Sequence, residues 1–586
     1  MRLIRFEFTW LLGLALLSGC MSKIQPEGNR INSNRGASGA SYEYTQRLIN
    51  RSWDENSAVV IAFNGPTANI SGSGAVFAGG TLTIREPGTY VLSGTLENGQ
   101  VLINAGKNDV ISLVLNGVSL RNETGPAIYA PKSKEIALII EEGTRNTVSD
   151  GSSRTALTDD EPDAAIYIQD SLSISGSGIL NVSGNNRHGI RAQDILTITG
   201  GVISVNSAVD AVRGRDGVVI NNGSFTIEAG GDGIKSNNDK DAARGYVTIT
   251  GGTFDIKAGN DGIQAESVLA ITGGVFKIVT GGGSANAPIP AQSSNRGWGR
   301  QTPVAQTTTE ESTKGIKAGS LINISGGDIT IDSKDDGVHS NGGVIVTSGK
   351  LSIRTGDDGI HADAAVEISG GDIDIPVCNE GVEGLSVTIS GGRTVVVSRD
   401  DAINAADGSA SGGRTGWGRS LNESIFVRIS GGTVDLFALH DGIDANGNVF
   451  IEGGTVKISG PSQMMEGAID FDGSLFVTGG ELITAGSVLG ASQNSRQPVV
   501  FVSYNRQQPS GSVIAVKDSR GNTLLEYTSK TAYSYSGFTS PSFKTGETYS
   551  LFINGGKRVD FRLNDIIFGI GDDGGAYNGG RGVRRR

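Results

Sequence analysis

A short phrase that returns at a fixed interval is the feature that most constrains this chain. Gly315, Gly337, Gly359 and Gly381 lie 22 residues apart, and each opens a short apolar run. A fixed period of about 20–50 residues is the sequence signature of stacked structural repeats. The chain is therefore expected to build at least this part from coils that stack on one another.

The content of one coil predicts which kind of repeat this is. Apolar residues alternate with polar ones in three short runs, namely Ile316 and Ala318, Ile322 and Ile324, and Ile329 and Ile331. A period of two predicts strands with one buried face. The Gly326-Gly327 pair separates the last two runs, where a tight turn favours residues without Cβ. Three short strands per roughly 22 residues predict an all-β fold, a parallel β-helix solenoid.

Acidic residues accompany the repeated glycines. Equivalent residues of adjacent coils would lie about 4.8 Å apart, and two carboxylates at that distance repel by roughly 3 kcal/mol at an effective dielectric near 20. Protons, water or a cation must relieve this repulsion, and Ca²⁺ suits such a set of oxygen ligands. The predicted calcium ligands are Asp335, Asp336, Asp357, Asp358, Glu380, Asp400 and Asp401, followed by Asp232, Asp261 and Asp441.

The alternative is that these acids only shape turns. Asp-Gly is a common turn pair because Asp tolerates and caps tight turns, but a turn does not need the second Asp of a doublet. His339, His361 and His440 flank the same phrase. Imidazole is a poor ligand for Ca²⁺, so these histidines are expected as flanking contacts.

The N-terminus reads as a targeting segment. Arg2 and Arg5 precede an apolar run from Phe8 to Leu17, which is too short for a membrane span and typical of a signal peptide in residues 1–20. The run ends Leu-Ser-Gly-Cys, which resembles a bacterial lipobox and predicts lipidation of Cys20. An ordinary signal peptide with a coincidental Cys is the alternative.

These features predict a cell-envelope lipoprotein, at the outer membrane or cell surface, that meets the membrane through its lipid anchor alone. Met21, rather than Asp, after the lipidated Cys favours that destination. Residues 21–57 are polar and form an expected tether. The formal net charge of −12 argues against nucleic acid as a partner.

The remaining boundaries follow from where the repeat holds and where it breaks. Residues 58–485 are expected to form the β-helix, with exposed loops at 281–313 and 408–420 and a short insertion near 237–244. Residues 486–565 carry more aromatics and should form a C-terminal β cap, and a β cap is also expected at the N-terminal end. Residues 566–586 are a Gly/Arg-rich tail. Cys378 is expected in a loop or on an outward face.

The two long loops share a phrase in which Trp stands between glycines and arginines. An indole face can stack on a sugar ring, and an arginine can pair with a uronate carboxylate. A Trp that packs back on the base of its loop is the alternative. The candidate carbohydrate-binding residues are Arg296, Trp298 and Arg300 in the first loop, and Arg414, Trp417 and Arg419 in the second.

A long ordered set of segments carries a specific resemblance. It comprises GTYVLSGTLENGQVLI from Gly88, VISLVLNGVSL from Val110, PAIYA from Pro126, EEGTRNTVSDG from Glu141, and then the Asp-Gly-Ile coils. The chain resembles a family of bacterial carbohydrate-binding β-helix proteins, described as calcium-containing binders of cellulose and acidic sugars with a fold like that of pectate lyases. The likeness covers most of residues 60–560. It implies a right-handed β-helix, bound Ca²⁺ and a polysaccharide partner.

Three functions remain open. The first is a non-catalytic, calcium-binding, lipid-anchored protein that binds cellulose or acidic polymers such as polygalacturonate. The second is a calcium-dependent polysaccharide lyase of the pectate type, which needs a base to abstract a proton; Lys235 and Lys317 share a strand face with His339 and His361. The third is a structural or adhesion protein without a sugar ligand. The carboxylates follow the repeat and do not break it, which favours binding, and the oligomeric state is open.

Overall fold

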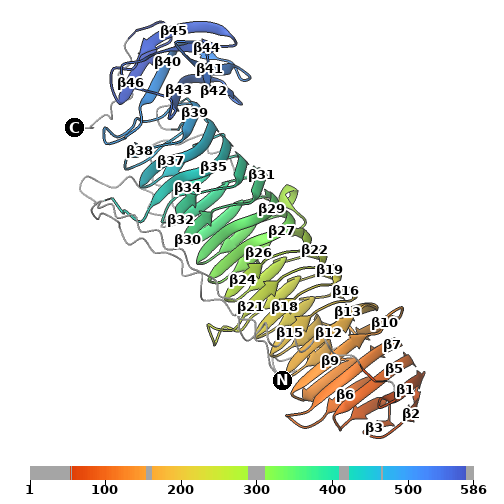
Figure 1. Ribbon diagram of the computed structural model, residues 1–586. Coiled ribbons are helices and arrows are strands. Elements are labelled where there is room, and N and C mark those ends of the chain that lie inside the picture. Colours follow the sequence, from red (N-terminus) through yellow and green to blue (C-terminus); the bar gives the residue numbers. More distant parts are fainter. Residues whose placement is uncertain are drawn as a thin grey trace, which may run out of the picture. The chain divides into compact units, whose positions relative to one another are not determined.

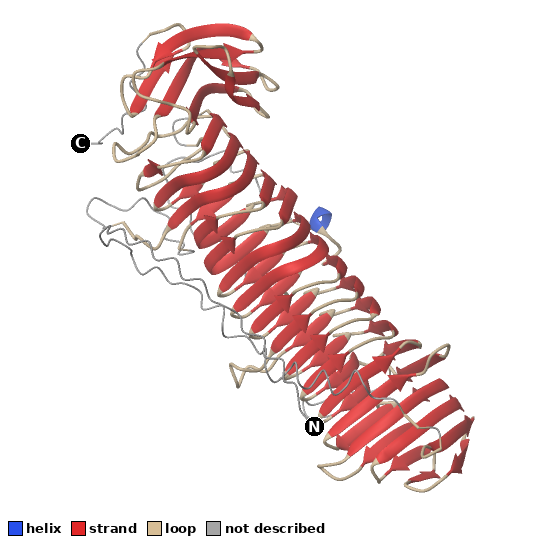
Figure 2. Cartoon of the chain, in the orientation of Figure 1, coloured by secondary structure: helices blue, strands red, loops and turns tan. Residues whose placement is uncertain are grey.

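The computed structural model describes residues 53–54, 56–152, 162–287, 311–407, 421–462 and 466–575. Within these ranges the secondary structure is β-strand except for one short 3-10 helix at Ser284–Asn286 (Figure 2). The all-β prediction is confirmed. No helix in the described ranges combines the length and the apolar character needed to cross a membrane.

Each coil contributes one strand segment to each of three parallel ladders, so the strands of one coil pair with the equivalent strands of the next (Figure 1). Val338 pairs with Ile360, and Ile360 pairs with Val382, which shows that the 22-residue spacing brings the repeated phrases side by side. The first ladder contains β4 (Thr81–Ile84), β6 (Gln100–Asn104), β8 (Ile128–Lys132), β11 (Ala164–Ile168), β14 (His188–Ala192), β17 (Val212–Gly214), β20 (Ile234–Ser236), β23 (Ile263–Ala265), β26 (Ile316–Ala318), β28 (Val338–Ser340), β30 (Ile360–Ile368), β32 (Val382–Ile389), β34 (Ile403–Ala405) and β36 (Asp444–Ala445).

The second and third ladders share several long strands that bend between them. Strands of both ladders are β1 (Val59–Asn64), β5 (Gly88–Leu96), β7 (Val110–Asn122), β27 (Leu321–Ser333), β29 (Gly343–Thr355), β35 (Phe426–Ala438) and β37 (Asn448–Ser459). The second ladder adds β9 (Glu135–Ile140), β12 (Ser171–Gly176), β15 (Ile195–Ile198), β18 (Gly217–Ile220), β21 (Tyr246–Ile249), β24 (Val268–Ile271) and β38 (Leu475–Val477), together with the C-terminal parts of β30 and β32. The third adds β10 (Arg145–Asp150), β13 (Ile179–Gly184), β16 (Val202–Ser207), β19 (Ser224–Ala229), β22 (Thr253–Ala258), β25 (Val275–Thr280), β31 (Asp372–Cys378), β33 (Arg393–Ser398) and β39 (Glu481–Ala485).

The alternating apolar residues form one continuous core between the three ladders. Ile316, Ile322 and Ile329 are fully buried, one from each strand of their coil. Phe225, Phe254 and Phe276 stack from coil to coil with ring centroids 4.7 and 4.6 Å apart. Full burial of each such side chain contributes about 1.5–3 kcal/mol, so the core stabilises the stack along its whole length.

Two kinds of glycine make the turns of a coil possible. Gly327, between the second and third strands, has φ +96°, a conformation that costs a residue with Cβ strain. Gly337 precedes the first strand, and a Cβ there would lie 2.3 Å from Ile353 Cγ2. The repeated glycines therefore mark the places where the coil turns most sharply and packs most closely.

Pairing becomes antiparallel towards both ends of the ladders. β2 (Thr67–Ser71) pairs with β1, and β3 (Ala75–Ala78) pairs with β4, both antiparallel. After β39, the strands β40 (Val499–Gln508), β43 (Tyr533–Thr539) and β46 (Ile567–Gly571) continue the large sheet. A separate antiparallel sheet contains β42 (Thr523–Thr528), β41 (Val513–Asp518), β44 (Thr548–Ile553) and β45 (Gly556–Arg562).

Two expectations from the sequence are wrong. Residues 566–586 are not entirely a tail, because Ile567–Gly571 form β46 and pair in parallel with β40. Cys378 is fully buried at the end of β31, not in a loop or on an outward face. A register irregularity between Ile375 and Cys378 shifts the alternation and turns the thiol inward.

Candidate metal centre

A column of residues runs beside the first ladder, at the position immediately before each repeated glycine or its alanine equivalent. We call it the acidic column. Its members align vertically, and in five of the eight steps between coils the backbone N–H of one member donates to a carboxylate oxygen of the member before it. For example, the backbone N–H of Asp358 donates to Asp336 Oδ1 at 3.1 Å, and the backbone N–H of Asp441 donates to Asp401 Oδ1 at 2.8 Å. Its members are Asp210, Asp232, Asp261, Lys314, Asp336, Asp358, Glu380, Asp401 and Asp441.

This geometry separates the two members of each acidic doublet. Asp336 and Asp358 belong to the acidic column and are buried. Asp335 and Asp357 lie one residue earlier and are more exposed. Asp400 also lies outside the column, and its Oδ1 is 3.1 Å from His440 Nδ1. The predicted doublet ligands therefore have different surroundings, although the structure brings oxygens of Asp335, Asp336 and Asp357 within 4.8 Å of one another.

A second column faces outward from the first ladder, three residues after the acidic column. We call it the outer column. Its members pair directly from coil to coil, so their side chains lie beside the carboxylates of the acidic column. In chain order they are Arg213, Lys235, Gln264, Lys317, His339, His361, Glu383, Asn404 and Asp444.

Side chains of the protein itself neutralise the first half of the acidic column. Arg213 Nη1 lies 3.3 Å from Asp210 Oδ2, and Lys235 forms an ion pair with Asp232. Lys317 Nζ lies 3.5 Å from Asp261 Oδ2. Each of these buried carboxylates thus has a cation within ion-pair distance, which offsets part of the cost of burying its charge; for Asp232 burial still outweighs Lys235 and raises the pKa to about 6.

Lys314 plays the same role from within the acidic column. Its Nζ lies 2.9 Å from Asp335 Oδ2 and 2.7 Å from Asp336 Oδ2, and His339 Nδ1 lies 2.7 Å from the same Asp336 oxygen. Burial alone would raise the pKa of Asp336, but the hydrogen bonds from His339 and Lys314 hold it below its ordinary value. This carboxylate is ionised and already paired.

The second half of the column has no such partners among the described residues. The outer column there offers Glu383, Asn404 and Asp444 in place of lysines. Burial, together with Asp444 and Asp400, raises the pKa of Asp401 to about 9. Burial and further carboxylates also raise the pKa of Glu380 and of Asp441 to about 8.

Asn404 supplies an observation that the sequence did not bring out. Its Nδ2 donates to Glu380 Oε2 at 2.9 Å, whereas its Oδ1 is buried and has no hydrogen-bond donor. An orphaned carbonyl oxygen beside Glu380 and Asp401 is a ligand that Ca²⁺ accepts. The outer-column register, which only the stacked fold establishes, is the signal that identifies it.

Several predicted site residues lie outside the described residues. They are Cys20 and the six loop residues Arg296, Trp298, Arg300, Arg414, Trp417 and Arg419. Their proposed lipidation and sugar contacts stay predictions.

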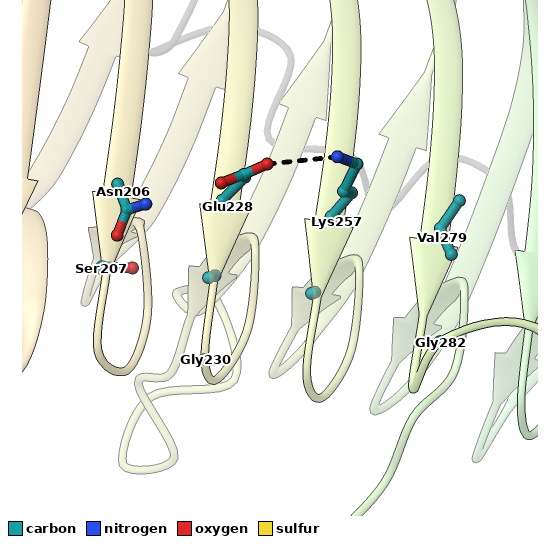
Figure 3. Close-up of a pocket in the computed structure, with 9 residues that line it drawn as sticks. Asn206, Ser207, Glu228, Gly230, Lys257, Val279 and Gly282 are labelled. Carbon is teal, nitrogen blue, oxygen red and sulfur yellow. Dashed lines mark hydrogen bonds and ion pairs between the residues drawn. The ribbon is translucent and has the colours of Figure 1, made fainter.

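A shallow pocket of about 370 Å³ lies on the outer side of β16, β19, β22 and β25 (Figure 3). Glu228 and Lys257 project over it from adjacent strands, and their side chains pair at 3.2 Å. Small residues such as Gly230 and Ala258 form its floor. It has polar groups that can meet sugar hydroxyls and no aromatic platform.

A family model described as carbohydrate-binding domain-containing protein matches residues 78–359 and 357–481. The chain belongs to this family of carbohydrate-binding domain-containing proteins. The match of this family model confirms the resemblance seen in the sequence.

This chain is similar to one further protein by sequence and to one solved structure. A carbohydrate-binding domain-containing protein of Acetivibrio thermocellus is 36% identical over 126 residues, which is 21% of this chain and 44% of the relative. The chain thus spans less than half the length of that relative. A structure titled as the polysaccharide lyase-like protein from C. thermocellum, a gadolinium derivative, aligns over 47% of this chain and 94% of that one, at 27% identity and a TM-score of 0.35.

Proposed function

We propose that the protein is a calcium-binding, non-catalytic polysaccharide-binding protein, built on a right-handed parallel β-helix with a β cap at each end and held in the cell envelope by a lipid on Cys20. Its expected ligands are cellulose or acidic polymers such as polygalacturonate. The observation that carries the calcium part is the unneutralised end of the acidic column at Glu380, Asp401 and Asp441. Family membership carries the carbohydrate part.

The donor atoms at this end are of the type that Ca²⁺ prefers. They are carboxylate oxygens and the orphaned Oδ1 of Asn404, and hard cations take six to eight such oxygens. The proposed ligands are Glu380, Asp401 and Asp441 with Asn404 and Asp444, and Asp400 at the margin. Of the other predicted ligands, Asp232, Asp261, Asp335, Asp336 and Asp358 each have a Lys or His side chain within ion-pair distance. Asp335, Asp336 and Asp357 offer oxygens that all lie within 4.8 Å of one another, so they remain a second candidate set.

Bound Ca²⁺ would supply two functions at this end. It would remove the repulsion between stacked carboxylates, and its remaining coordination positions could bind a uronate carboxylate. The protein's own contribution is to hold the oxygens at coil spacing on a rigid core. The loop residues Trp298 and Trp417 would provide sugar-stacking platforms.

The surroundings of the candidate bases favour binding over a lyase reaction. Lys235 is paired with Asp232, whose carboxylate outweighs burial and raises the lysine pKa. Burial lowers the pKa of His361, but hydrogen bonds to Asp358 and Glu383 raise it to about 11. A general base near neutral pH needs a pKa close to the working pH, so these two groups are poorly suited to abstract a proton.

The test is a pull-down on insoluble cellulose and on pectate gel, with Ca²⁺ and with EDTA, together with metal analysis of the purified protein. Retention on pectate that requires Ca²⁺, with stoichiometric calcium in the protein, is the expected result. A sustained rise in ultraviolet absorbance of polygalacturonate, from an unsaturated product, would overturn the non-catalytic assignment. Retention on neither polymer would leave the structural alternative. Labelling of Cys20 with a lipid precursor tests the anchor.

A further inference from the structure

His361 stands where the outer column changes from cationic to acidic side chains. Its Nδ1 lies 2.7 Å from Glu383 Oε2 and 3.1 Å from Asp358 Oδ2. Its Nε2 lies 3.3 Å from Asp363 Oδ1 on the solvent side. Three carboxylates from two successive coils therefore surround one imidazole.

The two ring nitrogens of His361 have surroundings like those of a metal-binding histidine. Such a histidine usually donates its distal N–H to a carboxylate, which orients the ring and directs the other nitrogen at the ion. With Nε2–H donating to Asp363, the Nδ1 lone pair of His361 faces two carboxylate oxygens, which are also acceptors. Something positive must lie between them. A proton on Nδ1 meets this need with one charge, and a divalent ion meets it with two.

The three inward donor atoms are close enough to share one ion. Asp358, His361 and Glu383 each offer an atom, and these atoms all lie within 4.8 Å of one another. A set of one imidazole nitrogen and two carboxylate oxygens suits zinc and similar transition metals better than calcium, which prefers oxygen ligands. His361 and Glu383 keep 21% and 18% of their side chains exposed, so the ion would retain a coordination position open to water.

The neighbouring coil provides a built-in comparison. His339 stacks on His361 with ring centroids 4.8 Å apart and planes within 9°. Its Nδ1 also contacts a carboxylate, that of Asp336, but Lys314 already neutralises that oxygen. Its Nε2 meets the amide oxygen of Asn341, not a carboxylate. The stacked rings are thus alike in position and different in charge environment.

We propose that Asp358, His361 and Glu383 form a three-ligand site for a divalent transition metal of the zinc type, with Asp363 as the residue that orients the histidine. The site is separate from the oxygen-only calcium ligands further along the acidic column. It does not depend on carbohydrate binding, so the two proposals can fail independently.

The test uses the full mature chain without a histidine tag, stripped of metal and held at mildly alkaline pH. Titration with Co²⁺, followed by its visible absorbance, should show one tightly bound ion that Zn²⁺ displaces and millimolar Ca²⁺ does not. His361→Gln and Glu383→Gln should each remove this absorbance. His339→Gln should leave it unchanged.

Asp363→Asn is the sharpest variant. Its side chain is 56% exposed, so the substitution should leave the fold intact. Loss of an orienting carboxylate typically lowers metal affinity 10–100-fold, and a decrease of that size with unchanged stoichiometry is expected. Cobalt absorbance that survives His361→Gln, that is lost equally in His339→Gln, or that Ca²⁺ abolishes would overturn the assignment, and so would the absence of any binding.

Discussion

The contrast between the two halves of the acidic column can be tested by giving the second half the partner that the first half has. Asn404 occupies the place in the outer column that Lys235 and Lys317 occupy in earlier coils. Asn404→Lys would put an ammonium group beside Glu380 and Asp401. The variant should therefore resemble the self-neutralised half and lose its need for calcium.

The structure sets the size of the expected effect. The pKa of Asp401 is about 9 when metal is absent, against 3.8 for a free carboxyl. At pH 7 folding must therefore protonate a group that is ionised in the unfolded chain, which costs up to roughly 4 kcal/mol. Lysine at position 404 would remove part of that cost, about 2–4 kcal/mol, because a unit charge about 4 Å away contributes roughly 4 kcal/mol at an effective dielectric of 20.

Thermal unfolding in EDTA and in Ca²⁺ measures the effect. The parent should gain about 2.7 kcal/mol from calcium at a hundred times its dissociation constant. Asn404→Lys should be more stable than the parent in EDTA and gain little from calcium. Asn404→Gln, which is longer but uncharged, is the control and should keep the calcium response. If Asn404→Lys is no more stable in EDTA and keeps the full calcium shift, the carboxylates at this end are not what calcium neutralises.

Three further predictions follow from the same contacts. Because the pKa values of Glu380, Asp401 and Asp441 are raised above their unfolded values, their contribution to stability is complete below about pH 4 and is lost as pH rises through 8–9. The melting temperature in EDTA should therefore fall as pH rises from 4 to 9, and Ca²⁺ should make it depend less on pH. Identical pH profiles in EDTA and in Ca²⁺ would contradict the assignment. Lys314→Gln removes the cation that pairs with Asp335 and Asp336, so it should cost about 3–5 kcal/mol in EDTA and make the first half calcium-responsive, which unfolding of the variant with and without Ca²⁺ would reveal. Burial raises the pKa of the Cys378 thiol, so Ellman's reagent should react with it only after denaturation, and rapid reaction in the native protein would contradict the burial of this thiol.

The fold was largely readable from the sequence because two periods coincide. The alternation of Ile316, Ile322 and Ile329 with polar residues identifies strands, and the 22-residue spacing of the glycines identifies which strands are neighbours. Both signals are local. Cys378 and β46 escaped because a register irregularity and a strand far from its partner leave no local period.

The candidate site was only partly readable. The carboxylates were found because they repeat, but their counterions were not recognised. The pair of Lys235 with Asp232 is three residues apart and visible in hindsight. The pair of Lys314 with Asp336 exists only after stacking, since 22 residues separate the two. Likewise, Asn404 looks like an ordinary strand residue until its orphaned oxygen is seen beside Glu380.

The two ways of neutralising the column have different consequences for a charged ligand. Where Arg213, Lys235 and Lys317 supply the positive charge, the surface carries the same charge with and without calcium. Where the charge would come from a bound ion, as proposed beside Glu380 and Asp401, these carboxyl groups are protonated and uncharged near pH 7 without calcium, and calcium would replace their protons and offer open coordination positions. An acidic polysaccharide would then find no ion to coordinate in one state and be bound through calcium in the other, with the change confined to the second half of the stack. Uncharged cellulose would be affected little by the same change, so the ratio of pectate to cellulose retention should follow calcium concentration even where cellulose binding alone does not.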